Sequence, residues 1–293
     1  MWIKNIKLQN FRNYKELDLN LGENVNILFG ENAQGKTNIL EAIFLCSLGK
    51  SFRTNKEKEM INIEKDNSLI EVEFVKTDRE GKIKIQLSNK KSVYINDIKI
   101  KKLSELLGKI NIVIFTPDDI DIIKGSPQNR RKFLDVMISQ LRPNYMYILS
   151  LYQKTMEQRN NYLKQIKEEK KQEDFLEIWD EKLADYGTKI YMYRKEFIEK
   201  IINKIKKIHK EITDEKEQIE IEYISECRSK EEYLNLLKQR KKLDIIKGYT
   251  TKGIHRDDFN IYINGKQIDI YGSQGQQRTA ILSLKLSELQ IIY

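Results

Sequence analysis

The fold is decided by the stretch Gly30-Glu31-Asn32-Ala33-Gln34-Gly35-Lys36-Thr37, which matches the phosphate-loop pattern G-x-x-x-x-G-K-[S/T] at every fixed position. Apolar residues from Val25 to Phe29 precede it as a predicted strand, and Lys36 to Leu48 follow with helical spacing. The two glycines let backbone N–H groups turn toward a phosphate. Lys36 places an ammonium near the β and γ phosphates, and Thr37 offers a hydroxyl to Mg²⁺. This stretch predicts a nucleotide site with Mg²⁺.

Outward from the loop, the first third of the chain has the patterns of strands. Trp2 to Leu8 and Tyr14 to Leu21 alternate apolar and polar residues, as half-buried strands do. Three further segments predict an antiparallel set: Leu69 to Val75, Lys82 to Leu87, and Ser92 to Ile100 with a turn at Asn96-Asp97. Asn111 to Phe115 is predicted as one more apolar strand.

The middle third is predicted to be helical. From Pro127 to about Ile212 the sequence shows helical periodicity and dense charge, with no strand pattern. After Trp179, apolar residues recur in steps of three and four as a narrow seam, which is typical of a helix packed on a partner helix. We expect a projecting helical hairpin, in which Phe175 to Ile212 spans roughly 50 Å. The alternative is an ordinary helical bundle.

The last third returns to mixed patterns. Gln218 to Ile224 is a predicted strand and Lys230 to Ile246 a predicted helix. Asn264-Gly265, between Phe259 to Ile263 and Lys266 to Ile270, predicts a hairpin. Gln276 to Tyr293 is helical. The predicted class is α/β, with mixed sheets and an inserted helical arm. Its expected parts are 1–125 as the first part of a head domain, 126–246 as the arm, and 247–293 as the second part of the head.

Composition excludes several classes of protein. Of the 293 residues 40% are hydrophobic, which is enough for a core, and 53 basic against 44 acidic residues give a net charge of +9. Cys46 and Cys227, with only His209 and His255 beside them, predict neither a disulfide framework nor a zinc site. No apolar run reaches the roughly 18 residues of a membrane span, and the N-terminus has no signal-peptide pattern. We therefore expect a cytoplasmic protein without a membrane partner.

A second glycine motif precedes the last helix: Gly272-Ser273-Gln274-Gly275-Gln276-Gln277. Ser273 with Gln276 has the form of a capping box, which by itself explains the segment as a helix start. Gly275 falls in the first helical turn, however, where glycine costs stability unless something approaches the backbone closely. The segment resembles the signature motif of ABC-type ATPases, which addresses the γ phosphate held by a second subunit. The resemblance implies an ATP-dependent homodimer, with Ser273, Gln274, Gly275, Gln276 and Gln277 acting in trans.

The whole chain resembles the RecF family, ABC/SMC-like ATPases of bacterial DNA repair. The matching stretches run collinearly: 8–14, the phosphate loop, 49–54, 115–119, 124–127, 130–135, 179–183, 253–258 and 271–278. The resemblance implies an ATPase head built from both ends of the chain, and a part in DNA replication, recombinational repair and the SOS response to DNA damage. It also implies binding to single-stranded or gapped DNA, and a RecR-type partner that helps to load recombinase.

Two site assignments come from the same resemblance. Arg12, just after the first strand, is implied to reach the nucleotide, and its alternative is a solvated arginine at the end of a strand. In the family, the helix after the signature motif leads to a strand with paired carboxylates that hold Mg²⁺ and position water. The sequence to Tyr293 has no such segment, so we expect no catalytic residue within this chain and ATP binding without turnover.

Charge gives only weak candidates for DNA contacts. The clearest clusters are Arg130-Arg131-Lys132 and Arg240-Lys241-Lys242, and each is equally typical of a solvated helix face. Two other functions stay open beside a DNA-repair clamp. A P-loop enzyme acting on a small molecule explains the phosphate loop but leaves the helical insertion unused. A structural module that does not hydrolyse ATP would use the arm for protein contacts.

Overall fold

The computed structural model describes residues 1–77, 79–169 and 171–293. The chain divides into two compact units, Met1–Ile114 (unit 1) and Phe115–Tyr293 (unit 2). Both units combine β-strands with helices, and the predicted α/β class is confirmed. The expected boundaries at 125/126 and 246/247 both fall inside unit 2, and the division into head and arm stays a prediction.

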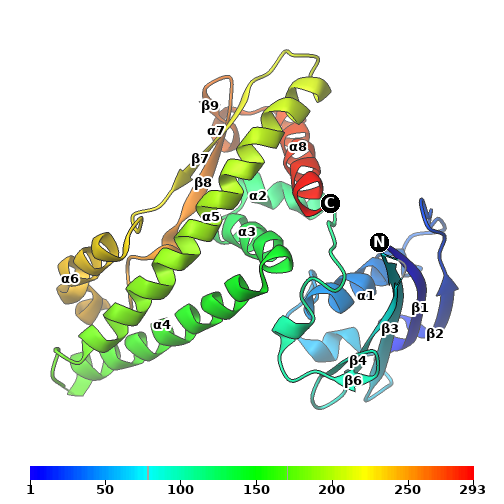
Figure 1. Ribbon diagram of the computed structural model, residues 1–293, viewed down its shortest axis with the longest axis horizontal. Helices are drawn as coiled ribbons and strands as arrows, with labels where there is room; N and C mark the ends of the chain where they lie inside the picture. Colours follow the sequence, from blue (N-terminus) through cyan, green and yellow to red (C-terminus); the bar gives the residue numbers. More distant parts are fainter. Residues whose placement is uncertain (78, 170) are drawn as a thin grey trace. The chain divides into compact units, whose positions relative to one another are not determined.

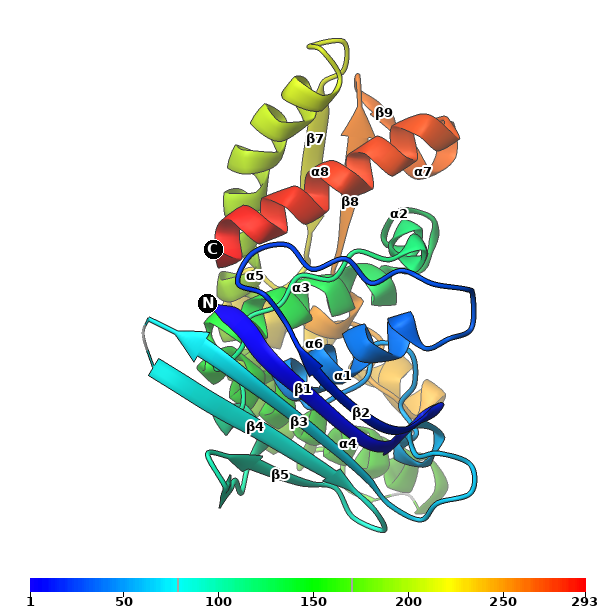
Figure 2. The same cartoon turned by 90° about the vertical axis from the view of Figure 1, so that its right-hand side faces the viewer.

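Unit 1 is an antiparallel sheet with one long helix. The sheet has the order β2-β1-β3-β4-β5-β6, and Figure 2 shows its first five strands side by side. Alternation buries Ile6 and Leu8 of β1 on the core face, where helix α1 (Lys36–Leu48) packs. The strands are β1 (Trp2–Phe11), β2 (Tyr14–Asn20), β3 (Ser68–Lys76), β4 (Arg79–Leu87), β5 (Ser92–Ile95) and β6 (Ile98–Lys99). Two short 3₁₀ helices, η1 (Glu57–Met60) and η2 (Leu103–Glu105), complete the unit.

Two predicted strands of unit 1 do not form. The segment 25–29 has no strand partner within the described residues, and the side chains of Val25, Ile27 and Phe29 are 84%, 79% and 90% exposed. Residues 111–115 also lie outside the sheet. A strand exists only where a neighbour accepts and donates its backbone hydrogen bonds, and apolar composition alone does not supply that neighbour.

Unit 2 contains most of the helices and a smaller sheet of order β7-β8-β9 (Figure 1). Helix α5 is continuous for 37 residues, about 55 Å. The helices are η3 (Pro117–Ile120), α2 (Asp121–Lys124), α3 (Pro127–Leu141), α4 (Pro143–Glu169), α5 (Leu176–Ile212), α6 (Lys230–Lys247), η4 (Ile254–Arg256), α7 (Ile268–Tyr271) and α8 (Gln274–Ile292). The strands are β7 (Ile219–Ile224), β8 (Asp258–Ile263) and β9 (Lys266–Gln267).

The predicted helical hairpin forms from α4 and α5, but the seam of α5 has more than one partner. Its first half packs on α4 and α6, and its second half packs on β7 and on α8, as Figure 1 shows. Ile201 and Ile205 of α5 therefore belong to the same core as Leu284 of α8. The predicted strand 266–270 is also shorter than expected, since Ile268 turns into α7.

Arginines with little or no exposure hold the segment Thr250–Asp258 in unit 2. Arg159 of α4 donates to Asp244 (2.7 Å) and to the Thr250 hydroxyl (2.9 Å). Arg194 of α5 donates to the Ile254 carbonyl oxygen at 2.9 Å. Arg130 of α3 forms a two-point ion pair with Asp258 at 2.6 and 2.9 Å. Because these guanidinium groups lose water in the fold, the carboxylates and carbonyls opposite them must stay in place.

His255 lies in the same segment within a chain of buried hydroxyl groups. Its Nδ1 is 2.8 Å from the Tyr152 hydroxyl, which is 2.7 Å from that of Tyr233, and its Nε2 is 3.2 Å from the Thr250 carbonyl oxygen. The Nε2–H tautomer satisfies all three groups. Gly253 (φ 142°) is required beside it, because a Cβ there would lie 2.0 Å from the Tyr233 oxygen. Burial lowers the pKa of His255 to about 4.

No helix in the described ranges is both long enough and apolar enough to span a membrane.

The depressed pKa of His255 predicts a loss of stability in acid. The unfolded chain takes up this proton near pH 6.5 and the folded chain near pH 4, so stability falls as pH decreases through that window. Between pH 7 and pH 5 the loss is about 2 kcal/mol. His255→Gln keeps a donor and an acceptor but cannot titrate, and urea unfolding should show that this part of the pH dependence is absent. Equal slopes in the two proteins would contradict the assignment.

Candidate functional site

The phosphate loop turns through residues with positive φ: Gly30 (143°), Ala33 (66°) and Gly35 (98°). Gly35 is the N-cap of α1, so the loop leads directly into a helix N-terminus. The backbone N–H groups of residues 31–35 have no hydrogen-bond acceptor within the described part of the chain, and residues 30–34 are exposed. Free amide donors at a helix N-terminus are the groups that bind a phosphate anion.

The side chains of Lys36 and Thr37 complete this arrangement. The Lys36 ammonium folds back on the loop and donates to the carbonyl oxygens of Gly30 (2.7 Å) and Glu31 (2.5 Å). Both acceptors are neutral, so an anionic phosphate oxygen would bind this ammonium more strongly. Thr37 is exposed, and its hydroxyl has no partner among the residues that the structure describes.

The turn between β1 and β2 forms a wall beside the loop. A Cβ at Gly35 would lie 2.6 Å from Asn13 Oδ1 and 2.8 Å from Tyr14 Cε2, and Asn38 Nδ2 donates to Asn13 Oδ1 at 2.7 Å. Sequence reasoning placed no site role on Asn13 or Tyr14. In the sequence only their place in the stretch 8–14 pointed to a role for them. The alternation of apolar and polar residues in β1 and β2 does not show what the turn between these strands contacts.

Arg12 is held inside unit 1 by a buried carboxylate. Its Nε and Nη2 donate to Glu41 of α1 at 3.0 and 2.6 Å, and its Nη1 donates to the Glu59 carbonyl oxygen at 2.6 Å. Glu41 is fully buried and also accepts from Ser51 and, at 3.4 Å, from Arg53. Arg12 is thus an ion-paired arginine, and the alternative of a solvated one does not hold. Its predicted contact with a nucleotide stays a prediction.

Removal of the Glu41 carboxylate should destabilise unit 1. Glu41→Ala leaves the guanidinium of Arg12, whose side chain is only 18% exposed, without its partner. Breaking such a pair from one side costs about 3 kcal/mol in the free energy of unfolding, measured with urea. Glu80→Ala removes the exposed partner of Lys4 and serves as the control, with an expected change below about 0.5 kcal/mol. Similar losses in both variants would refute a special role for Glu41.

The second glycine motif forms the start of α8 as a capping box, as predicted. Ser273 Oγ accepts from the Gln276 backbone N–H at 3.2 Å, and Gln276 Oε1 accepts from the Ser273 N–H at 2.9 Å. Ser273, Gln274 and Gly275 are exposed. A Cβ at Gly275 would meet nothing closer than Ser273 Oγ at 3.8 Å. Nothing within the described chain therefore requires glycine at this position.

The two glutamines that follow are used internally. Gln276 Nε2 donates to Glu217 at 2.9 Å. Gln277 is buried and its Nε2 donates to the carbonyl oxygens of Ile268 (3.1 Å) and Gly272 (3.2 Å). Of the five residues predicted to act in trans, the first three are exposed, Gln276 is half-buried and Gln277 is buried, and the role of all five in trans stays a prediction.

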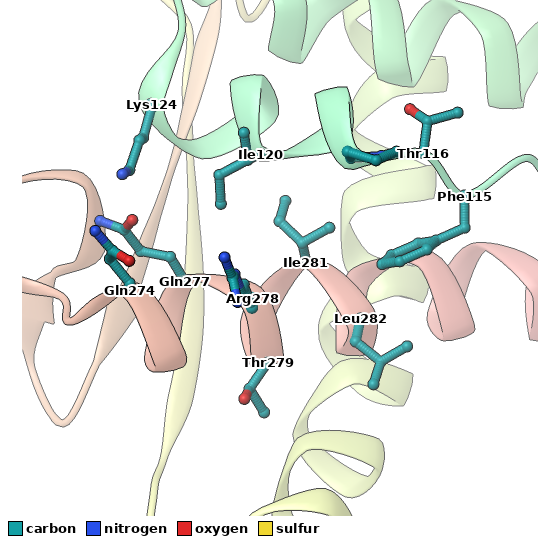
Figure 3. Close-up of a pocket in the computed structure, with 11 residues that line it drawn as sticks. Phe115, Thr116, Ile120, Lys124, Gln274, Gln277, Arg278, Thr279, Ile281 and Leu282 are labelled. Carbon is teal, nitrogen blue, oxygen red and sulfur yellow. The ribbon is translucent and has the colours of Figure 1, made fainter. Parts of the chain in front are cut away.

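A hollow of about 660 Å³ lies beside this helix start, between the segment 115–124 and the first half of α8. Figure 3 shows Lys124 on the same side of the hollow as Gln274 and Gln277, and Phe115 toward Leu282. Lys124 and Arg278 have no ion-pair partner in the described ranges. The hollow thus joins an apolar wall to two free cations.

The residues predicted to contact DNA differ in their surroundings. Arg130 is committed to Asp258 and to the carbonyl oxygen of Gly125 (3.0 Å), and Arg131 donates to that of Asp257 at 2.7 Å. Lys132 is exposed. In the second cluster Lys241 lies 3.4 Å from Glu173, while Lys242 is exposed. A DNA contact at 130–132 stays a prediction.

Comparison with known proteins places this geometry in a class. The family model described as an AAA domain matches residues 5–247. A phosphate loop on the long helix of an α/β unit is consistent with that match, and the chain is an AAA-domain protein.

The family can be stated more narrowly. The chain is 46% identical over its whole length to the DNA replication and repair protein RecF of Clostridium acetobutylicum, of which it covers 82%. RecF of Clostridium perfringens is equally similar, with 46% identity and 82% coverage. The chain therefore belongs to the RecF family.

Solved structures agree with this assignment. The recombination mediator protein RecF-ATP in the RecFOR pathway superimposes with a TM-score of 0.95 at 43% identity, over 99% of this chain and 80% of that one. The Smc head domain of Pyrococcus furiosus has a TM-score of 0.55 at 16% identity, over 99% of this chain and 79% of that one. At this low identity, the similarity to the Smc head domain shows a common fold and nothing more.

Proposed function

We propose that this chain is an ATP-binding protein of DNA replication and repair in the bacterial cytoplasm. ATP binds to the phosphate loop of one copy and is contacted by Ser273 of a second copy. The ATP-bound dimer engages single-stranded or gapped DNA together with a RecR-type partner and helps to load recombinase. Family membership, and the solved RecF structure whose name includes ATP, support the proposal.

The observation that carries the proposal is that the phosphate loop has hydrogen-bond donors without strong acceptors. Its amide donors are free, and Lys36 rests only on two loop carbonyls. A triphosphate can replace these carbonyls as the acceptor for Lys36 without breaking any packing contact of unit 1. Binding therefore needs little reorganisation of the protein.

The same residues fit Mg²⁺. The described residues contain no group of three or more His, Cys, Asp or Glu side chains that could hold a metal ion. Mg²⁺ is often bound by one or two protein ligands together with phosphate oxygens and water. The unpartnered Thr37 hydroxyl supplies such a ligand. When bound, Mg²⁺ would neutralise charge on the β and γ phosphates.

Replacement of Lys36 tests the phosphate site. Lys36→Ala removes a charge-assisted hydrogen bond to the phosphates and should weaken ATP affinity about 30-fold, measured by calorimetry. The free energy of unfolding should not change, because the ammonium is at the loop surface. Lys56→Ala, whose side chain is 80% exposed, is the control and should bind ATP normally. Equal affinity of Lys36→Ala and the unchanged protein would contradict the proposal.

Accessibility of the α8 start supports contact with a second copy. Ser273, Gln274 and Gly275 are exposed, and the free N–H groups of a first helical turn attract a phosphate. Glycine at 275 is explained by an approaching ligand, since no internal group comes close. Sedimentation with ATP, ADP or no nucleotide tests the proposal, because the clamp requires a dimer with ATP alone.

Gly275→Ala should make the protein more stable and its ATP-dependent dimer weaker. Alanine is the better helix former by about 0.5–1 kcal/mol, and its Cβ has room, so the free energy of unfolding should rise. The same methyl group should block the approach of the partner's nucleotide and weaken the ATP-dependent dimer at least tenfold in sedimentation. A variant that is more stable and dimerises normally would rule out close approach at Gly275.

A further inference from the structure

A chain of hydrogen bonds connects the end of α5 with the start of α8. Glu217, in the segment between α5 and β7, lies at its centre. One carboxylate oxygen, Oε1, accepts from Gln276 Nε2 at 2.9 Å, and the other, Oε2, lies 3.2 Å from His209 Nε2. Gln276 continues the chain through its Oε1, which accepts from the Ser273 N–H at 2.9 Å. We call this set, His209–Glu217–Gln276–Ser273, the α5–α8 bridge.

The direction of each hydrogen bond in the bridge is fixed. His209 is fully buried, and burial lowers its pKa, against the opposing effect of Glu217. A carboxylate only accepts, so Nε2 of His209 carries a hydrogen and donates to Glu217, while Nδ1 lies 2.9 Å from the Ser283 hydroxyl of α8, whose oxygen also lies 2.9 Å from the Thr279 carbonyl oxygen. Gln276 must point its oxygen at the Ser273 N–H, which leaves its NH₂ group for Glu217. A carboxylate is the one side chain at 217 that serves both donors.

The backbone on either side holds Glu217 in place. Gln218 and Asn264 of the β8–β9 turn exchange two hydrogen bonds, Gln218 N–H to Asn264 Oδ1 at 2.8 Å and Asn264 N–H to the Gln218 carbonyl oxygen at 2.9 Å. On the other side, Thr213 N–H caps the His209 carbonyl oxygen at 3.0 Å. These bonds fix the backbone on both sides of Glu217, so the two hydrogen bonds of its carboxylate are made together in the observed position of the α8 start.

We propose that Glu217 is a positioning residue that sets the place of the Ser273–Gly275 segment from the end of α5. The inference rests on the proposed function, in which that segment meets the nucleotide of a second copy. Any displacement of α5 is then transmitted to Ser273 through three side chains. Glu217 itself touches no nucleotide, and it acts through the side chain of Gln276.

An exchange of acid and amide across the bridge tests the proposal. Glu217→Gln leaves one acceptor oxygen for two donors, so amide hydrogen exchange in residues 273–278 should become about tenfold faster. Gln276→Glu places two carboxylates against each other and should have at least the same effect. In the double variant the amide at 217 donates to the acid at 276 and its oxygen accepts from His209, so exchange should return to the original rate.

Glu215→Gln, on the same loop but paired with exposed Lys210 at 3.0 Å, is the matched control and should leave exchange at 273–278 unchanged. ATP-dependent dimerisation should follow the exchange rates, weakened about tenfold in Glu217→Gln and regained in the double variant, while ATP affinity of the phosphate loop stays constant. Unchanged exchange in Glu217→Gln, or a double variant worse than either single one, would overturn the bridge. A different outcome is that the unsubstituted protein forms no ATP-dependent dimer while the single variants still speed hydrogen exchange at 273–278 and the double variant restores it. In that case the proposed function fails and the positioning role of Glu217 stands.

Discussion

The geometry of unit 2 depends on the matching of buried guanidinium groups to the segment Thr250–Asp258. Helix α3 supplies two arginines to this segment, Arg130 and Arg131, and helices α4 and α5 supply one each, and each arginine has given up water to do so. The desolvation is offset only while all the partners keep their places. Because β8 begins at Asp258, its register with β7 and the path into α7 and α8 are fixed from the same point.

Unit 1 repeats this arrangement on a smaller scale around Glu41. The buried carboxylate binds the end of β1 through Arg12 to the helix that begins at Lys36, and Asn13 and Tyr14 then lie against Gly35. The loop itself is left with few internal contacts. A rigid frame around a loop with free donors is the physical condition for binding a phosphate without prior rearrangement.

Local patterns in the sequence were sufficient for much of this structure. The alternation of β1 and β2, the bounds of α1, the length of α5 and the capping box at Ser273 each follow from residues close together in the chain. What local patterns could not supply depended on distant partners. Segment 25–29 has strand composition without a strand neighbour, Arg12 pairs with a carboxylate 29 residues away, and Gln276 meets Glu217 across 59 residues. Periodicity reports which face of an element is apolar, but it does not report which polar groups meet there.

Gly253 illustrates how such contacts constrain divergence. Its missing side chain is the space into which the Tyr233 hydroxyl extends, with the Tyr152 hydroxyl next to it. A larger residue at 253 is tolerated only if smaller residues replace Tyr152 and Tyr233 and the backbone at 253 also adopts a φ other than 142°. The three positions, on α4, on α6 and in the segment after α6, are therefore expected to change together over evolutionary time, because either tyrosine placed opposite a larger residue at 253 would clash with it.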